Sequence, residues 1–347
     1  MNSNIALLLA QDGLTNGLVY ALMALSILLV FVVTRVLWVP AGDFLMLGAL
    51  SLALFQQGVV PGTVWLTGCL GLLCALVEGW RAWRRGNARG LPATLLLSLG
   101  IPLVAGALSL WLAPMKPPLP VQIALVIGLV APIGYIVYRV VFQPLADRPT
   151  LTLMFVAVAV HYALTGLGLI FFGSEGFRTP PFIPGRIDIG VTRVSWQLML
   201  VFAASAVLML ALWHFFGRSL WGKALRATAV NRFGARLVGI RTNSTGALAF
   251  TLAAAIGAFS GVLIGPVTTL YYDSGFLVSL KGFVGAVIGG LASFPLAVLG
   301  AVLVGLVESF AAFYASPFKE AIVFGLLIPF LLWRSATQPR RHEDEEH

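Results

Sequence analysis

The sequence predicts an all-α, polytopic transmembrane helix bundle of about ten spans with broken helices. Hydrophobic residues make up 59% of its 347 residues, and charged residues only 10%. A soluble domain carries about 25% charge. The mean hydropathy is +0.95, and long apolar runs recur along the chain. These runs continue for about 20 residues without the alternation of barrel strands, so we expect helices.

The apolar runs follow one another from end to end, which predicts a single transmembrane domain, residues 1–347. The run 282–291 is too short to cross a bilayer, because a spanning helix needs about 20 residues. We therefore expect half of a broken helix, or a re-entrant piece, at that place. In order, the runs are 14–33, 39–55, 64–77, 91–112, 121–141, 151–172, 196–216, 246–270, 282–291, 296–313 and 321–333.

Basic residues predict the orientation of these spans, since Lys and Arg are retained on the cytoplasmic side. Arg35 falls on the same side as the basic loops at 81–89 and 139–148 and the charged tail, 335–347. The N-terminus is then outside and the C-terminus inside. The Pro- and Gly-rich loop 173–195 is external. The net charge of +9 reflects this topology rather than nucleic-acid binding.

Residues 217–241 form the most distinctive segment, with six basic residues and no acid between two apolar runs. This predicts a cytoplasmic location. One interpretation is a helix on which a soluble partner docks, and the other is a basic loop that only sets topology. Apolar residues recur near helical spacing between the basic ones: Leu220, Ala224, Ala227, Val230, Leu237 and Ile240.

A chain break precedes Asp43 at the start of the second run. Pro40 lacks an amide proton and Gly42 is permissive, so the backbone there can unwind toward a cavity. Asp43 then either caps the following helix, where the dipole favours an acid, or lies on a solute pathway. His161, in the middle of another run beside Thr165, is predicted to hydrogen-bond between helices. No acid is near it in sequence, so proton coupling is not predicted.

Two glycine-rich stretches lie near the C-terminus. Gly289 and Gly290 precede a helix break at Pro295, and broken helices are where transporters place ligands. The other stretch has four-residue intervals that line one helix face and permit close packing: Gly257, Gly261 and Gly265.

Several kinds of site are not predicted. The chain has no HExxH motif, no Walker sequence and no nucleophile–base pair, so neither a catalytic residue nor an NTPase site is expected. No metal and no cofactor are expected. Cys69 and Cys74 are five residues apart, do not share a helix face and are interpreted as packing residues. The N-terminus lacks the basic region of a cleavable signal peptide.

Four stretches carry a resemblance to a known family. They are 17–25 (GLVYALMAL), 41–49 (AGDFLMLGA), 226–240 (RATAVNRFGARLVGI) and 281–295 (KGFVGAVIGGLASFP), the last continued by 297–300 and 305–308. Residues 139–172 also fit. Together they resemble the H-type inner-membrane permease subunit of branched-chain amino-acid ABC importers.

The resemblance implies a permease that translocates a branched-chain or hydrophobic amino acid, or a related small organic solute, across the bacterial inner membrane. Two cytoplasmic ATP-binding subunits would hydrolyse ATP, so the chain itself is not expected to be an enzyme. The other implied partners are a homologous M-type permease or a second copy, a periplasmic solute-binding protein and membrane lipid. The segment 217–241 becomes a cytoplasmic coupling segment.

The residue patterns and the resemblance together give the candidate residues. Those for the solute pathway are Pro40, Gly42, Asp43, Gly48, His161, Gly289, Gly290 and Pro295. Those for ATPase coupling are Arg218, Arg226, Asn231, Arg232, Ala235 and Gly239.

The chain departs from the family in two places. The family's Asn-x-Ala-His/Gln-Gly pattern is replaced by Trp38-Val39-Pro40-Ala41-Gly42, which removes side-chain donors and predicts a solute with a sizeable hydrophobic part and one polar end. Residues 58–120 look like inserted spans. The alternatives are an ion-coupled secondary transporter and, from another class, an intramembrane enzyme. The spans supply few of the ionisable residues that either needs.

Overall fold

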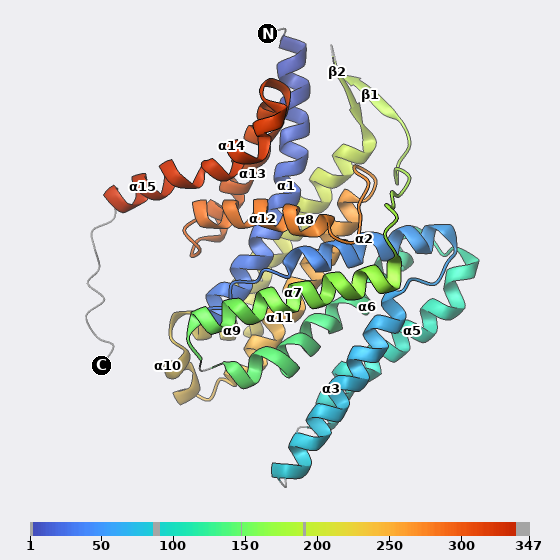
Figure 1. Ribbon diagram of the computed structural model, residues 1–347, viewed down its shortest axis with the longest axis vertical. Coiled ribbons are helices and arrows are strands. Elements are labelled where there is room, and N and C mark those ends of the chain that lie inside the picture. The colour runs from blue at the N-terminus through green and yellow to red at the C-terminus, as the bar shows by residue number, and fades with distance from the viewer. Residues whose placement is uncertain (1–2, 86–90, 147, 190–191, 338–347) are drawn as a thin grey trace.

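The computed structural model describes residues 3–85, 91–146, 148–189 and 192–337. Within these ranges, nine helical segments are long and apolar enough to cross a membrane. They pack into one bundle (Figure 1), which confirms the predicted all-α transmembrane fold. Most of the predicted tail, and the tip of the basic loop 81–89, lie outside the described residues.

The helices appear in the following order. They are α1 (Ser3–Thr34), α2 (Ala41–Gln57), α3 (Thr63–Arg85), α4 (Leu91–Leu95), η1 (Leu96–Gly100), α5 (Ile101–Leu112), η2 (Ala113–Met115), α6 (Leu119–Val137), η3 (Tyr138–Phe142), η4 (Gln143–Leu145), α7 (Thr150–Phe172), α8 (Trp196–Arg218), α9 (Leu220–Val230), α10 (Arg232–Leu237), α11 (Thr242–Ile264), α12 (Ser274–Ile288), α13 (Phe294–Tyr314), η5 (Ser316–Phe318), α14 (Lys319–Gly325) and α15 (Leu327–Thr337).

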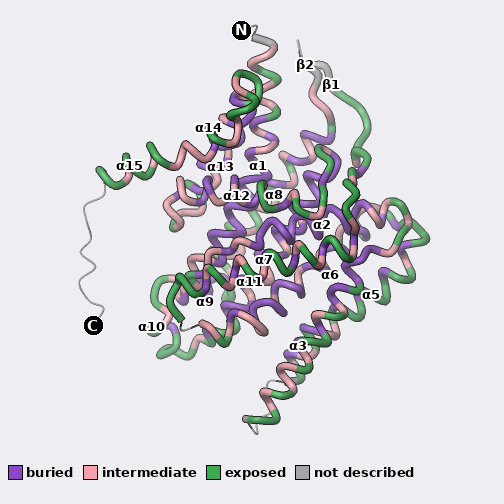
Figure 2. Tube along the Cα trace, viewed as in Figure 1, coloured by how far each residue is buried: buried purple, intermediate pink, exposed green. Residues whose placement is uncertain are grey.

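Two apolar helices are shorter than a full span. Helix α12 begins at Ser274, before the predicted run 282–291. With 15 residues it is still too short to cross a bilayer alone. Helix α2 has 17 residues, 14 of them buried, and lies in the middle of the bundle against α6, α11 and α12 (Figure 2). A helix that stops inside a membrane needs protein around its ends, because lipid cannot satisfy free backbone groups.

Helix α3 is longer than predicted. The run 64–77 suggested an incomplete span, but the helix continues to Arg85 and reaches 23 residues. The extension contains Glu78 and Arg81, whose side chains form an ion pair of 2.7 Å, and an ion pair at a span end removes the cost of isolated charges there. Helices α3 and α5 both fall in residues 58–120 and pack on α6. That they are an insertion stays a prediction.

The loop 173–195, predicted to be external, contains a small antiparallel hairpin. Strands β1 (Arg186–Ile189) and β2 (Thr192–Ser195) pair with Arg186 opposite Ser195. Ser195 also caps α8 by accepting a hydrogen bond from the Leu198 amide at 3.3 Å. Two backbone hydrogen bonds of 2.9 Å join Phe177 to Leu270, so the loop is fixed to the segment that leads into α12.

Small residues allow the central helices to touch. A Cβ on Gly261 of α11 would lie 1.9 Å from the carbonyl oxygen of Leu45 in α2. A Cβ on Gly257 would lie 2.9 Å from the Cβ of Phe44. This confirms the packing predicted for these two glycines. Gly265 instead ends α11 and faces Thr179 of the loop 173–195.

Candidate functional site

An irregular segment, residues 35–40, leads into α2. Arg35 has a φ of 60°, and Trp38 is only 1% exposed, with its ring against Phe250 at 4.5 Å between centroids. Pro40 is the N-cap of α2, so the predicted break is present. The unwound residues are those before Pro40, however. The prediction of unwinding at Gly42 is wrong, because Gly42 already lies in the first turn of the helix.

Asp43, His161 and Thr165 form a buried polar group between α2 and α7. His161 Nδ1 lies 2.9 Å from Asp43 Oδ2 and 3.0 Å from Oδ1, and Thr165 donates to Oδ1 at 3.2 Å. The Asp43 side chain is 3% exposed and that of His161 9%. His161 thus makes the predicted contact between helices. Asp43 lies in the first turn of α2, where the dipole favours it, but its carboxylate binds α7.

A cavity of about 320 Å³ lies beside this polar group, between α7 and α12. His161 and Tyr162 line it from α7, and Phe276, Ser279 and Phe283 line it from α12. The imidazole of His161 stacks on Phe276, with centroids 4.7 Å apart. The wall is mostly apolar with one polar corner, an arrangement that binds and orients a small amphipathic molecule.

The first turns of α2 and α12 meet at two glycines. A Cβ on Gly42 would lie 2.0 Å from the carbonyl oxygen of Gly275, and Ser279 is next to the same position. Further along α2, a Cβ on Gly48 would lie 2.3 Å from the carbonyl oxygen of Ala258 in α11. Both glycines therefore allow helix contact. The crossing places two helix N-termini, each with a partial positive charge, near the cavity.

Gly289, Gly290 and Pro295 lie at the turn between α12 and α13. Gly290 has a φ of 74°, which favours glycine, and Pro295 is in the first turn of α13. A Cβ on Gly290 would meet the guanidinium of Arg334 in α15. The predicted helix break is thus present. These residues do not line the cavity, and their place on the pathway stays a prediction.

The basic segment 217–241, for which a coupling role is predicted, contains two helices rather than one. Asn231 leaves the helical conformation, with φ −150° and ψ 104°, and ends α9. Its side-chain Oδ1 accepts a hydrogen bond from the Gly234 amide at 2.8 Å, which starts α10. Asn is among the best N-cap residues, so this restart is a local sequence effect. The predicted single helix therefore has a joint at Asn231.

The coupling segment is anchored on one side and open on the other. Arg232 donates to the Ala146 carbonyl at 3.0 Å, and Ala235 is buried. Arg226 and Arg218 are exposed, the latter in the last turn of α8, and Gly239 has a φ of 85° after α10. Large apolar side chains between the exposed basic residues face outward, with exposed fractions of 70–88%: Leu220, Val230, Phe233, Leu237 and Val238.

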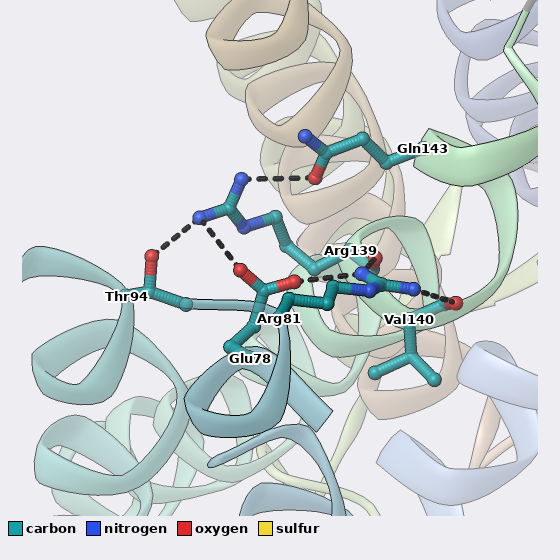
Figure 3. Close-up of polar contacts among 6 residues, drawn as sticks. All are labelled: Glu78, Arg81, Thr94, Arg139, Val140 and Gln143. Atoms are coloured by element: carbon teal, nitrogen blue, oxygen red, sulfur yellow. Dashed lines mark hydrogen bonds and ion pairs between the residues drawn. The ribbon is translucent and has the colours of Figure 1, made fainter. Parts of the chain in front are cut away.

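The sequence analysis missed two charge clusters. In the first, Glu78 of α3 lies 3.6 Å from Arg139 of η3, and Arg139 also donates to Gln143 at 2.9 Å and to Thr94 (Figure 3). In the second, Lys281 of α12 lies 2.6 Å from Glu308 of α13. Ionisable residues inside apolar runs were the available signal, because such residues are costly in a membrane unless paired.

A bundle of membrane-length helices with two short apolar helices, a largely apolar cavity and an exposed basic segment is typical of a multi-pass transport permease. Residues 9–332 match the family described as the permease component of the branched-chain amino acid transport system. The chain belongs to this family and is a permease subunit of an ABC importer. No solved structure matches it.

Named relatives agree with this assignment. The chain is 33% identical over 208 residues to the high-affinity branched-chain amino acid transport system permease BraD of Pseudomonas aeruginosa, covering 58% of this chain and 68% of BraD. It is 30% identical over 208 residues to LivH of Escherichia coli, covering 57% and 67% of the two chains. The LivH-type permease of Methanocaldococcus jannaschii is 24% identical over 224 residues, covering 62% and 70%.

Proposed function

We propose that this permease moves a branched-chain or another hydrophobic amino acid across the bacterial inner membrane, by a path that includes the cavity between α7 and α12. The carrying observation is His161, which lies at one corner of an apolar wall and is hydrogen-bonded to the buried carboxylate of Asp43. The carboxylate attracts a solute ammonium group, and the wall takes the side chain. Apolar burial contributes about 25 cal/mol per Å².

The cavity also disfavours strongly polar solutes. Phe276 and Phe283 supply aromatic surface rather than hydrogen-bond partners. A polar group buried without a partner costs about 1–3 kcal/mol. Urea would leave several groups unpaired, whereas leucine presents one apolar end. The names of BraD and LivH, both branched-chain amino acid permeases, support the same class of solute.

Two cytoplasmic ATP-binding subunits are proposed to hydrolyse ATP and to dock on the coupling segment, one on each permease subunit. The support is an exposed surface that combines large apolar side chains, Leu237 and Phe233 among them, with arginines and no acid. Surfaces of this kind mark protein interaction sites. A homologous M-type permease or a second copy completes the pathway, and a periplasmic binding protein delivers solute to the external loop 173–195.

The test is uptake of labelled leucine by vesicles that contain the permease with the partners encoded beside it. Unlabelled leucine, a benzoate-type acid and urea compete in turn, and leucine should compete best. Asp43→Asn should raise the KM for leucine. Asp12→Asn, the same change at an exposed position near the outer end of α1, should not. Preferential competition by urea, or equal KM values for both variants, would refute the proposal.

A further inference from the structure

Five side chains form a charged network behind the cavity. Lys281 of α12 donates to Glu308 of α13 at 2.6 Å and to Glu320 of α14 at 3.1 Å. Tyr20 of α1 donates its hydroxyl hydrogen to the other oxygen of Glu308 at 2.5 Å. Lys319 lies 3.7 Å from Glu308 and 3.5 Å from Glu320. The network therefore joins α12 to three other helices.

Its inner members are buried, while its outer members reach the surface. The side chains of Lys281 and Glu308 are 7% and 8% exposed, against 40% for Glu320 and 34% for Lys319. Three hydrogen bonds satisfy the two inner residues together. A buried charge persists only when it is paired in this way.

The network holds the face of α12 opposite the cavity. Phe276, Ser279 and Phe283 line the cavity from one face of the helix. Lys281 projects from the other side, since helical residues turn by about 100° each. Gly282, next to it, packs on Met23 of α1, where a Cβ would lie 2.5 Å from the Met23 Cβ. Any rotation of α12 that breaks the network also moves the cavity wall.

Apolar contacts alone do not fix such a rotation. Burial of apolar surface is non-directional. Charge-assisted hydrogen bonds are short and directional, so they select one register. Helix α12, with 15 residues, also has too little length to be placed by both membrane surfaces.

We propose that Lys281 and Glu308 are positioning residues that fix the rotation of α12 and thereby shape the solute cavity. The part of this inference that concerns solute rests on the proposed function of that cavity. The part that concerns α12 does not, and it is open to a measurement without solute.

The first test follows the position of α12 directly. In the assembled complex, Cys69→Ala and Cys74→Ala remove the native thiols, and Leu280→Cys places one thiol in the cavity wall. The labelling rate by a small maleimide reports access to that wall. Lys281→Met should change the rate by about fivefold or more. Lys281→Arg keeps the charge and the donors, so it should restore much of the parental rate.

A double variant separates positioning from mere stability. A buried ion pair replaced by two apolar residues is often as stable as the original pair. Lys281→Met with Glu308→Met should therefore assemble normally, with the pair of Lys319 and Glu320 still charge-balanced. Its labelling rate should remain altered and its KM for leucine should rise. Parental values for both in this double variant would overturn the inference.

A third variant separates failure of this inference from failure of the proposed function. Phe276→Ala removes apolar cavity wall without touching the network. If it raises the KM for leucine while the Lys281 variants change neither labelling nor KM, only the positioning role fails. If it leaves KM unchanged while Lys281→Met alters labelling, the positioning of α12 stands and the cavity is not the solute site.

Discussion

Gly42→Ala tests whether the crossing of α2 and α12 shapes the cavity. The new Cβ would lie 2.0 Å from the Gly275 carbonyl oxygen, so the helices must separate by about 1.4 Å to reach ordinary contact at 3.4 Å. Overpacking of this kind costs about 1–3 kcal/mol. Alanine regains about 1 kcal/mol of helix propensity. The net loss of stability is therefore small, about 0–2 kcal/mol.

Transport should suffer more than stability, because the separation moves Ser279 and the rest of the cavity wall. A displacement of about 1 Å in a positioned site costs up to about 100-fold in rate, and we expect leucine uptake to fall at least about tenfold. Gly48→Ala is the matched control. It lies on the same helix and makes a similar clash of 2.3 Å, but with Ala258 of α11, a helix that contributes no residue to the cavity wall.

The measurements are thermal unfolding of the purified complex and initial uptake rates in proteoliposomes. Similar shifts in unfolding temperature, with a strong loss of uptake only in Gly42→Ala, would support the reasoning. Equal losses of uptake in the two variants would refute it, because general loosening of α2 would then be the cause. Unchanged uptake in Gly42→Ala would refute it as well.

Three further predictions concern the segment 217–241 and the attachment of α3. Asn231→Ala removes the cap of α10 at a cost of about 1 kcal/mol and should reduce co-purification of the ATP-binding subunits. The control is Ser219→Ala, which removes the equivalent cap of α9 and shows whether cap loss in general has this effect. Arg226→Glu reverses an exposed charge and should weaken docking in a salt-dependent way, measured as solute-coupled ATPase activity, whereas intact coupling would favour a loop that only sets topology. Glu78→Gln should lower the stability of the complex by about 1–3 kcal/mol without changing the KM for leucine, since it weakens the attachment of α3 to Arg139; a changed KM would contradict this.

Composition was enough to predict the fold class. Lipid demands long apolar helices with internally satisfied backbones, so hydropathy alone locates most spans. Irregular places were also visible, because Pro40 and Pro295 interrupt apolar runs. The predicted lengths of the spans were less accurate. Helix α3 continues past Glu78, whereas the predicted run ended before this charged residue. Hydropathy does not show that Glu78 is paired with Arg139, which is distant in sequence.

The candidate site was only half predictable. Asp43 and His161 were each singled out, but they are 118 residues apart, and their pairing depends on how α7 packs on α2. Proton coupling was set aside because no acid is near His161 in sequence, and the structure supplies that acid from another helix. Lys281 and Glu308 were missed as a pair for the same reason. The joint at Asn231 had a local signal, an N-cap residue inside a helical pattern.

The charged network behind α12 contains two lysines and two glutamates, and their formal charges cancel. One elementary charge that crosses a potential of 100 mV exchanges about 2.3 kcal/mol with the membrane field. A neutral cluster that moves as a unit exchanges none, so such a movement is electrically silent. If Lys281 instead left Glu308 behind during the cycle, its displacement would appear as a transient current. In the first case, membrane voltage does no work on the network, and a zwitterionic amino acid such as leucine has no net charge on which it could act.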